Sequence, residues 1–228
     1  TVGSSYTYNT SAVGSPSGYT ILNLPGGLQF NPSNGQVTGT PTVAGTFPVS
    51  LVVNYSDDDG NLTDSDSSPD QLGSLFPPQN PGDRPQVILN LTVNAVAPTV
   101  TTLAASSIEA TKASFDGNVT STGGDAPDIR IYYGTSDGGT TASNWASVKE
   151  IGKKGSAFAE VIGDLIPSTT YHYRVRAYNS ASTDGVWASS SVSFSTQASN
   201  KPVVNNGSVL NRTGTSITFK GGVSSTGA

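Results

Sequence analysis

Apolar and polar residues alternate one by one along several stretches of the chain. In the N-terminal part, residues 47–53 and 87–93 carry apolar side chains at every second position. Successive side chains of a β-strand point to opposite faces of a sheet, so this period of two predicts strands with one buried face. In the first stretch, the inner face belongs to Phe47, Val49 and Leu51.

Strand patterns recur at short intervals further along the chain. Turn-forming residues separate them, and this spacing is typical of an antiparallel β-sandwich. Seven strands are predicted there, at 98–104, 112–120, 128–134, 147–152, 157–163, 169–179 and 190–196. The fold class that follows is all-β, with tandem antiparallel β-sandwiches.

A sequence repeat links the middle of the chain to its end at an offset of 104 residues. Nine positions are identical without a gap, mostly at alternate positions of a strand. They pair Pro98 with Pro202, Val100 with Val204, Thr111 with Thr215, Phe115 with Phe219, Gly117 with Gly221, Val119 with Val223, and Ser121-Thr122-Gly123 with Ser225-Thr226-Gly227. Two strands do not bury an apolar face alone, so we expect the parent chain to continue beyond this segment.

Two short links divide the chain into three parts. Residues 95–98 and 197–202 are predicted linkers, each of which enters a new module at a proline that begins an edge strand. The predicted domains are a sandwich at 1–96, a second sandwich at 97–197, and the first two strands of a repeat of the second sandwich at 198–228.

The first part contains a hairpin signal inside a longer turn-rich motif. Asn34-Gly35 is a strong hairpin signal because both residues tolerate positive φ. The motif comprises Leu24-Pro25-Gly26-Gly27-Leu28-Gln29-Phe30, Gly35, Gly39-Thr40-Pro41, Ala44-Gly45-Thr46 and Val49. It resembles the putative-Ig or cadherin-like repeat of bacterial surface proteins. The resemblance implies a non-catalytic Ig/cadherin-like β-sandwich over residues 1–96, with a first strand that would precede Thr1.

The second part carries a motif around its sixth predicted strand. Residues 165–179 run from Leu165-Ile166-Pro167 through Tyr171 to Asn179. This run resembles strand F of fibronectin type III modules, as found in large bacterial surface proteins. The resemblance implies that Tyr171 is a structural corner residue whose hydroxyl bonds back to the backbone.

The composition favours strands and turns over helices. Charged residues are 12% of the chain, against about 25% in ordinary soluble domains. Ser and Thr are abundant, whereas Glu and Lys, which favour helices, are few. The absence of Cys excludes disulfides, thiolate metal sites and a cysteine nucleophile. No apolar run approaches 18 residues, so we expect no membrane span in this segment.

Charge is spread unevenly, with a net value of −5. Residues 1–96 carry seven aspartates against the single base Arg84, and the last 31 residues carry only the bases Lys201, Arg212 and Lys220. An acidic chain without a continuous basic stripe argues against nucleic acid as a partner.

One acidic stretch departs from the motif of the first part. Residues 57–66 hold five aspartates around a glycine turn, the kind of loop that wraps oxygen ligands around Ca²⁺. The candidate calcium ligands are Asp57, Asp59, Asp64 and Asp66. A solvated acidic loop without metal is the alternative, so the cofactor prediction is none, with calcium left open.

Basic and aromatic residues gather on one predicted sheet face. Strand parity places on this outer face the residues Arg130, Tyr132, His172, Arg174, Arg176 and Tyr178. One interpretation is a patch for a partner chain or an anionic glycan. The other is a cation–π ladder, in which the arginines stack on Tyr132 or Trp187 and stiffen the sheet.

No motif for catalysis is present. His172 is the single histidine and sits mid-strand beside two arginines, a poor place for the base of a Ser-His-Asp relay. Metalloprotease, phosphate-loop and nucleophile-elbow motifs are also missing from the sequence. We therefore expect no enzyme.

The combined expectation is an extracellular or cell-surface repeat protein. Its segment would serve a structural or adhesive role, with other copies of the protein or neighbouring repeats as partners, and could assemble into a filament. The strands at 202–223 have open edges, so Phe219 and Val223 are candidates for strand exchange with a second subunit. The alternative function is a glycan-binding or spacer module of a secreted polysaccharide-active enzyme, for which Tyr132, Tyr178 and Trp187 would form an open platform.

Overall fold

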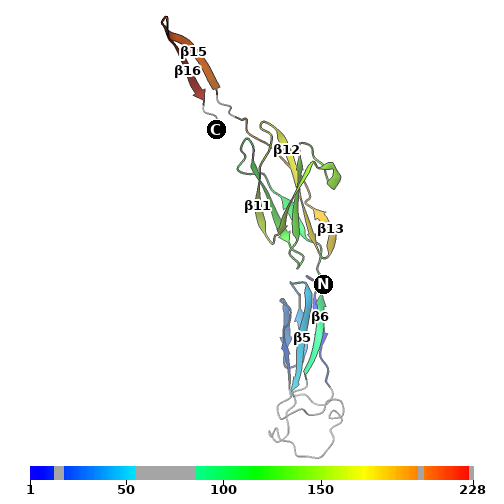
Figure 1. Ribbon diagram of the computed structural model, residues 1–228. Helices are drawn as coiled ribbons and strands as arrows, with labels where there is room; N and C mark the ends of the chain where they lie inside the picture. The colour runs from blue at the N-terminus through cyan, green and yellow to red at the C-terminus, as the bar shows by residue number, and fades with distance from the viewer. Residues whose placement is uncertain (13–17, 55–85, 200–202, 226–228) are drawn as a thin grey trace, which may run out of the picture. The chain divides into compact units, whose positions relative to one another are not determined.

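The computed structural model is built from strands, as the alternation of apolar residues predicts (Figure 1). It describes residues 1–12, 18–54, 86–199 and 203–225. All pairings between its strands are antiparallel, and the described helical structure is one short 3₁₀ turn, η1, at Ala142–Asn144. The prediction of an all-β class is confirmed. The described residues contain no helix long and apolar enough to cross a membrane.

Six strands of the N-terminal part form two three-stranded sheets. Their bounds are β1 Tyr6–Asn9, β2 Gly18–Leu22, β3 Leu28–Asn31, β4 Gln36–Gly39, β5 Gly45–Asn54 and β6 Gln86–Val93. The strand orders are β1-β4-β3 and β2-β5-β6. Val49, Leu51 and Val93 are buried, as the predicted parity of the long strands requires, whereas Val87 and Leu89 of the same predicted inner face are exposed.

The β3–β4 hairpin forms where predicted but not with the expected turn. Asn31 pairs with Gln36, so four residues rather than two make the connection. Only Gly35 has positive φ, at 68°. The Asn31 and Asn34 side chains instead accept hydrogen bonds from the N–H groups of Ser33 and Gln36 at 3.0 and 3.1 Å. These side-chain bonds stabilise the wider turn.

Eight strands form the second sandwich, one more than predicted. They are β7 Thr99–Thr102, β8 Ala113–Ser121, β9 Asp128–Gly134, β10 Ser147–Lys153, β11 Ala157–Ile162, β12 Thr170–Asn179, β13 Ser182–Trp187 and β14 Val192–Ser195. One sheet has the order β11-β8-β7, and the other has β10-β9-β12-β13 with β14 also on β12. β13 escapes the pattern because polar residues and Gly185, at φ 76°, break its alternation.

β12 carries two strands along one of its edges. Its first four residues, Thr170 to Tyr173, pair with the four residues of β14. β13 also neighbours β12. β14, the last strand of the sandwich, is therefore paired with its sheet over a short length.

The core of the second sandwich is dense and largely aromatic. Phe115 of β8 is fully buried, and its ring centroid lies 4.6 Å from that of Tyr173. Tyr133 and Phe194 contact the same ring edge-on at 5.4 and 5.2 Å. Strand parity predicts an inner face for β9 and β12 made of Ile129, Ile131, Tyr133, Tyr171, Tyr173, Val175 and Ala177. All of them are buried except Tyr133, which is partly buried against the same core.

Residues near the C-terminus form a separate two-stranded sheet. β15 Val203–Arg212 pairs with β16 Ile217–Ser225 through a turn, and no other described strand joins them. Phe219, at the copy position of the fully buried Phe115, is 79% exposed.

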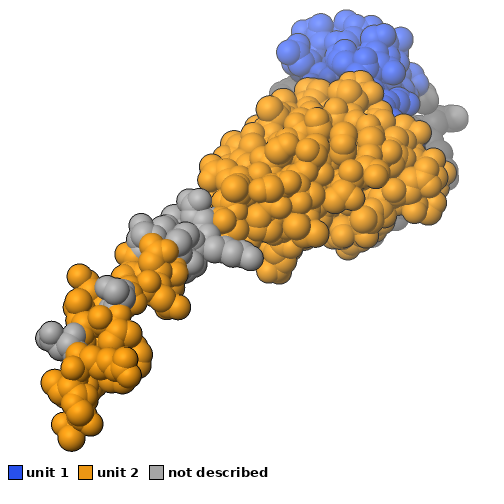
Figure 2. All heavy atoms as spheres, turned by 90° about the horizontal axis from the view of Figure 1, so that it is seen from above, with its two compact units in different colours: residues 1–97, 122–126, 179–183 blue, residues 98–121, 127–178, 184–228 orange. Residues whose placement is uncertain are grey.

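Contacts group the chain into two compact units (Figure 2). Unit 1 comprises residues 1–97, 122–126 and 179–183. Within it, the Val96 N–H donates to the Gly123 carbonyl at 3.0 Å. Unit 2 comprises residues 98–121, 127–178 and 184–228. The prediction that residues 198–228 belong to a third module stays a prediction.

Candidate functional site

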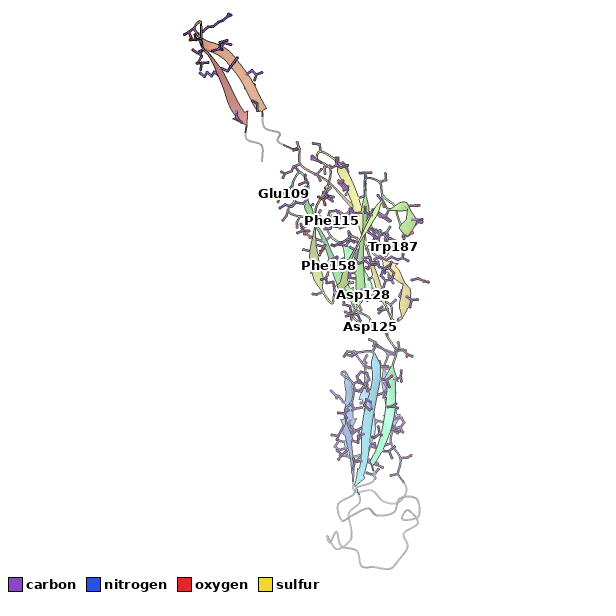
Figure 3. The ribbon with its side chains drawn as sticks, viewed as in Figure 1. Glu109, Phe115, Asp125, Asp128, Phe158 and Trp187 are labelled. Carbon is purple, nitrogen blue, oxygen red and sulfur yellow. The ribbon has the colours of Figure 1, made fainter. Side chains whose placement is uncertain are left out.

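The structure brings the predicted basic and aromatic residues together on the outer face of β9 and β12. Arg174 lies opposite Tyr132, and Arg176 lies opposite Arg130. Trp187, from the unpredicted strand β13, joins them (Figure 3). We call the following six residues the ladder: Arg130, Tyr132, Arg174, Arg176, Tyr178 and Trp187.

Guanidinium groups of the ladder lie over its rings. Arg176 is 4.7 Å from the centroid of Trp187 and 5.2 Å from that of Tyr178. Arg130 covers Tyr178 at 4.7 Å, and Arg174 lies 6.0 Å from Trp187. These distances fall within the range of favourable cation–π contacts. Cations therefore cover the rings of Tyr178 and Trp187.

Each arginine also has a partner other than a ring. Arg174 donates from Nε and Nη2 to the Ala188 carbonyl at 2.8 and 2.6 Å. Arg130 Nε pairs with Glu150 at 3.0 Å. Arg176 donates to the Asp184 carbonyl, while its buried Nε has no hydrogen-bond partner. The three charges are thus largely engaged within the sandwich, which lowers their availability for an external anion.

Two tyrosines of the ladder share a hydrogen bond. Their hydroxyl oxygens are 3.0 Å apart, and Tyr132 is only 7% exposed although it points outward. Burial is the largest influence on Tyr132 and opposes ionisation, but hydrogen bonds with Tyr178 and Arg130 outweigh it and lower its pKa. Burial and the bond to Tyr132 raise the pKa of Tyr178. Tyr132 is therefore the easier of the two to ionise, and the Tyr178 hydroxyl then donates the shared hydrogen bond to it.

His172 lies at the end of this face, opposite Gly134. Nearby, the Ser191 hydroxyl donates to the Asp137 carboxylate itself. That bond and the Gly139 N–H lower the pKa of Asp137, and the charge of His172 adds a smaller effect. A catalytic relay would need the serine to be bonded to the imidazole, so this arrangement serves to hold the loop.

We expect Trp187→Ala to lower the free energy of unfolding by about 2 kcal/mol, because it removes two cation–π contacts and a ring contact with Tyr132 at 4.7 Å. Urea unfolding measures this loss. Val148→Ala is the matched control, since Val148 pairs with Tyr132 across the sheet and is 51% exposed. It should change stability by less than about 0.5 kcal/mol. Equal effects of both changes would contradict a stabilising ladder.

Two tyrosine hydroxyls tie backbone segments to β12. Tyr171 accepts a hydrogen bond from the Ile166 N–H, five residues upstream, at 3.0 Å. Tyr173 donates to the Leu103 carbonyl at 2.5 Å and accepts the Asp116 N–H at 3.1 Å. Sequence reasoning did not single out Tyr173 for this bridge. The available signal was its inward parity, because a buried tyrosine needs a hydrogen-bond partner.

The calcium candidates Asp57, Asp59, Asp64 and Asp66 lie outside the described residues. Within the described part, no group of three or more His, Cys, Asp or Glu side chains is arranged to hold a metal ion. Calcium at the acidic loop therefore stays a prediction drawn from the sequence.

The calcium interpretation predicts that EDTA lowers the melting midpoint of the first module and that added Ca²⁺ restores it. Bound metal stabilises a fold by mass action, so the shift should grow with free Ca²⁺ concentration. Circular dichroism with Mg²⁺ as the control cation measures it. An unchanged midpoint would leave the solvated acidic loop as the explanation.

The strand-exchange candidates are both open to solvent. Phe219 is 79% exposed and Val223 is 62% exposed on β16. Their strand pairs only with β15 among the described strands. Exchange with a second subunit stays a prediction.

Residues 1–68 match the family model described as "Putative Ig domain". No curated protein matches the chain.

Among solved structures, the chain is similar to the sensor domain of the anti-sigma factor RsgI4 from Pseudobacteroides cellulosolvens. Identity is 26%, coverage is 46% of this chain and 99% of that one, and the TM-score is 0.32. A human KIAA0970 fibronectin type III domain matches at 15% identity, with 44% and 74% coverage and a TM-score of 0.31. Domains FN1–FN3 of chicken CNTN1 match at 14% identity, with 79% and 56% coverage and a TM-score of 0.34.

The fold follows from the strand pairing and from the alternating buried residues of β9 and β12 rather than from these similarities. The family match agrees with the Ig-like resemblance noted in the sequence of the first module. The chain is therefore built from antiparallel β-sandwiches, of which the first matches the putative Ig domain model over residues 1–68.

Proposed function

We propose that this chain is a non-catalytic structural or adhesive segment of a large secreted or cell-surface repeat protein, and that its repeats dock on neighbouring copies in an extracellular filament. The observation that carries this proposal is the internal repeat. The strands at 99–121 reappear at 203–225 with the same apolar positions. Reuse of one β-module along a chain provides length and surface rather than a reaction centre.

Packing within the second sandwich supports a load-bearing role. The inner face is an aromatic core around Phe115, and the outer face is stiffened by the ladder. Charged side chains on strands are few, and Ser and Thr occupy many strand positions. A surface of this composition stays soluble without a strong charge of one sign.

The alternative of a glycan-binding module requires open aromatic rings. The rings of Tyr178 and Trp187 lie under guanidinium groups, and Tyr132 is buried. This coverage favours the structural role over a stacking platform for sugars. Glycan binding that disappears in Trp187→Ala, with the fold intact, would favour the alternative instead.

Immunogold labelling of intact source cells tests the proposal. Antibodies raised against residues 97–197 should label the outside of unpermeabilised cells, and proteinase K should remove the label. Electron microscopy of shed material should then show labelled fibres. An antibody to a cytosolic protein is the control and should label only after lysis. Label confined to lysed cells would overturn the surface role, and label on isolated molecules alone would overturn the filament.

A further inference from the structure

Two loop segments from later in the chain belong to unit 1 (Figure 2). Residues 122–126 lie in the connection between β8 and β9, and residues 179–183 lie where β12 turns into β13. Contacts group both with residues 1–97 rather than with the strands that carry them. We call these two stretches the loop segments. Unit 1 is therefore completed by residues that follow it in the sequence.

Hydrogen bonds to the main chain hold the loop segments in unit 1. The Val96 N–H donates to the Gly123 carbonyl at 3.0 Å, and Asn179 Nδ2 donates to the Val96 carbonyl at 2.8 Å. The Ala44 N–H donates to the Gly124 carbonyl at 2.9 Å. Ala44 and Val96 lie just beyond the residues that pair β5 with β6. The loop segments thus supply the partners that main-chain groups need where the pairing of two strands ends.

Glycine is required at both carbonyls that accept these bonds. Gly123 and Gly124 have left-handed φ values of 67° and 84°. A Cβ added to Gly123 would lie 1.9 Å from the Val96 carbonyl oxygen. One added to Gly124 would lie 2.4 Å from Cγ2 of Val2. Any other residue at either position would therefore push the loop segment away from its partners.

The carboxamide of Asn179 joins the two loop segments to each other and to Val96. Besides the Val96 carbonyl, Nδ2 donates to the Thr122 carbonyl at 3.1 Å. Oδ1 accepts hydrogen bonds from the N–H groups of Ala181 and Ser182, both at 3.1 Å. A side-chain amide provides donors and acceptors together, whereas a carboxylate only accepts.

We propose that Gly123, Gly124 and Asn179 form a recognition site for the main chain at the end of the β5–β6 pair, and that unit 1 reaches its full stability only with this site bound. The groups recognised are the N–H of Ala44 and the N–H and carbonyl of Val96. All three belong to the main chain, so the site fits the end of a strand pair with little dependence on its side chains. The partner it suits is the Ig-like module that precedes it in the same chain.

The site links the folding of unit 1 to strands outside that unit. The loop segments take their shape only when β8, β9, β12 and β13 have formed, so unit 1 gains these hydrogen bonds only then. Because such coupling is reciprocal, the same bonds stabilise the turns that carry the site. A boundary at residue 96 then separates two sequence modules but not two folding units. The inference rests on contacts within unit 1 and is independent of the proposed function.

Amide hydrogen exchange measured by NMR tests the proposal on the full chain. The amides of Ala44 and Val96, which we call the reporter amides, should be protected in the unaltered protein, because both donate hydrogen bonds. Gly123→Ala should speed their exchange at least about tenfold, the factor that one hydrogen bond contributes. Gly139→Ala is the matched control, because Gly139 has a φ of 62° but no atom within 4 Å of an added Cβ. It should change the exchange of the reporter amides less than about twofold.

Asn179→Asp keeps the test decisive if the alanine variant disturbs its own turn. The carboxylate still accepts from the Ala181 and Ser182 N–H groups but cannot donate to the Val96 carbonyl. Exchange of the reporter amides should rise at least about fivefold, while the amides of Ala181 and Ser182 stay protected. Reporter amides without protection in the unaltered chain, unchanged exchange in Asn179→Asp, or equal effects of the two alanine variants would each overturn the proposal.

Discussion

We expect Phe115→Ala to lower the free energy of unfolding of the second sandwich by about 3–5 kcal/mol. Phe115 is fully buried, and its ring contacts Tyr133, Tyr173 and Phe194. Alanine removes the ring and leaves a cavity that this dense core cannot close without moving both sheets. A loss of this size is a large fraction of the stability of a small domain, about 5–15 kcal/mol.

Tryptophan fluorescence during urea unfolding measures this effect on the second sandwich. The chain has two tryptophans, Trp145 and Trp187, and both belong to unit 2. Phe219→Ala is a control supplied by the repeat itself, with the same residue at the copy position but 79% exposed. It should shift the fluorescence transition by less than about 0.5 kcal/mol. A small loss at Phe115 would show that the sheets do not meet at this ring.

The second large effect concerns alkaline pH and Tyr173. Burial raises the pKa of this phenol from 10.0 to about 12. Because the folded pKa lies above the unfolded one, the stabilising contribution of the neutral phenol is complete below pH 10. It is lost as pH rises from about 10 to about 12. At 1.36 kcal/mol for each unit, the total loss reaches about 2.7 kcal/mol.

Urea unfolding at several pH values from 9 to 12 measures the slope. These values span the interval between the ordinary and the raised tyrosine pKa. Tyr173→Phe lacks the titrating hydroxyl, so it should start less stable, because the Asp116 N–H and Leu103 carbonyl lose their partner. Its stability should then fall less steeply than that of the unaltered chain. Parallel slopes would mean that Tyr173 does not govern the alkaline loss.

Alternation in the sequence predicted which face of a strand a residue occupies, but it did not predict whether that residue is exposed to solvent. Ile131 and Val175 are buried as parity required, because a period of two determines which face of a strand a residue occupies. Parity also placed Tyr132 outward, but the residue is buried there by Trp187 of β13. The sequence of β13 does not alternate between apolar and polar residues, so neither the strand nor the burial of Tyr132 by Trp187 could be predicted. Long-range bonds such as that of Tyr173 depend on how two sheets meet, which no local pattern records.

The short pairing between β14 and β12 has a mechanical consequence. When tension is applied to the chain at residue 197, the load falls first on the backbone bonds of Gln197 and Thr196 to Glu109, Ser168 and Thr169, and then on the pairs that join Val192–Ser195 to Thr170–Tyr173. Each of these four pairs contributes little resistance, and the rest of β12 is not bonded to β14. Detachment of β14 also withdraws Phe194 from Phe115, so the first strand to peel away under force opens the aromatic core. The second sandwich would then yield from its C-terminal end and act as an extensible element under load.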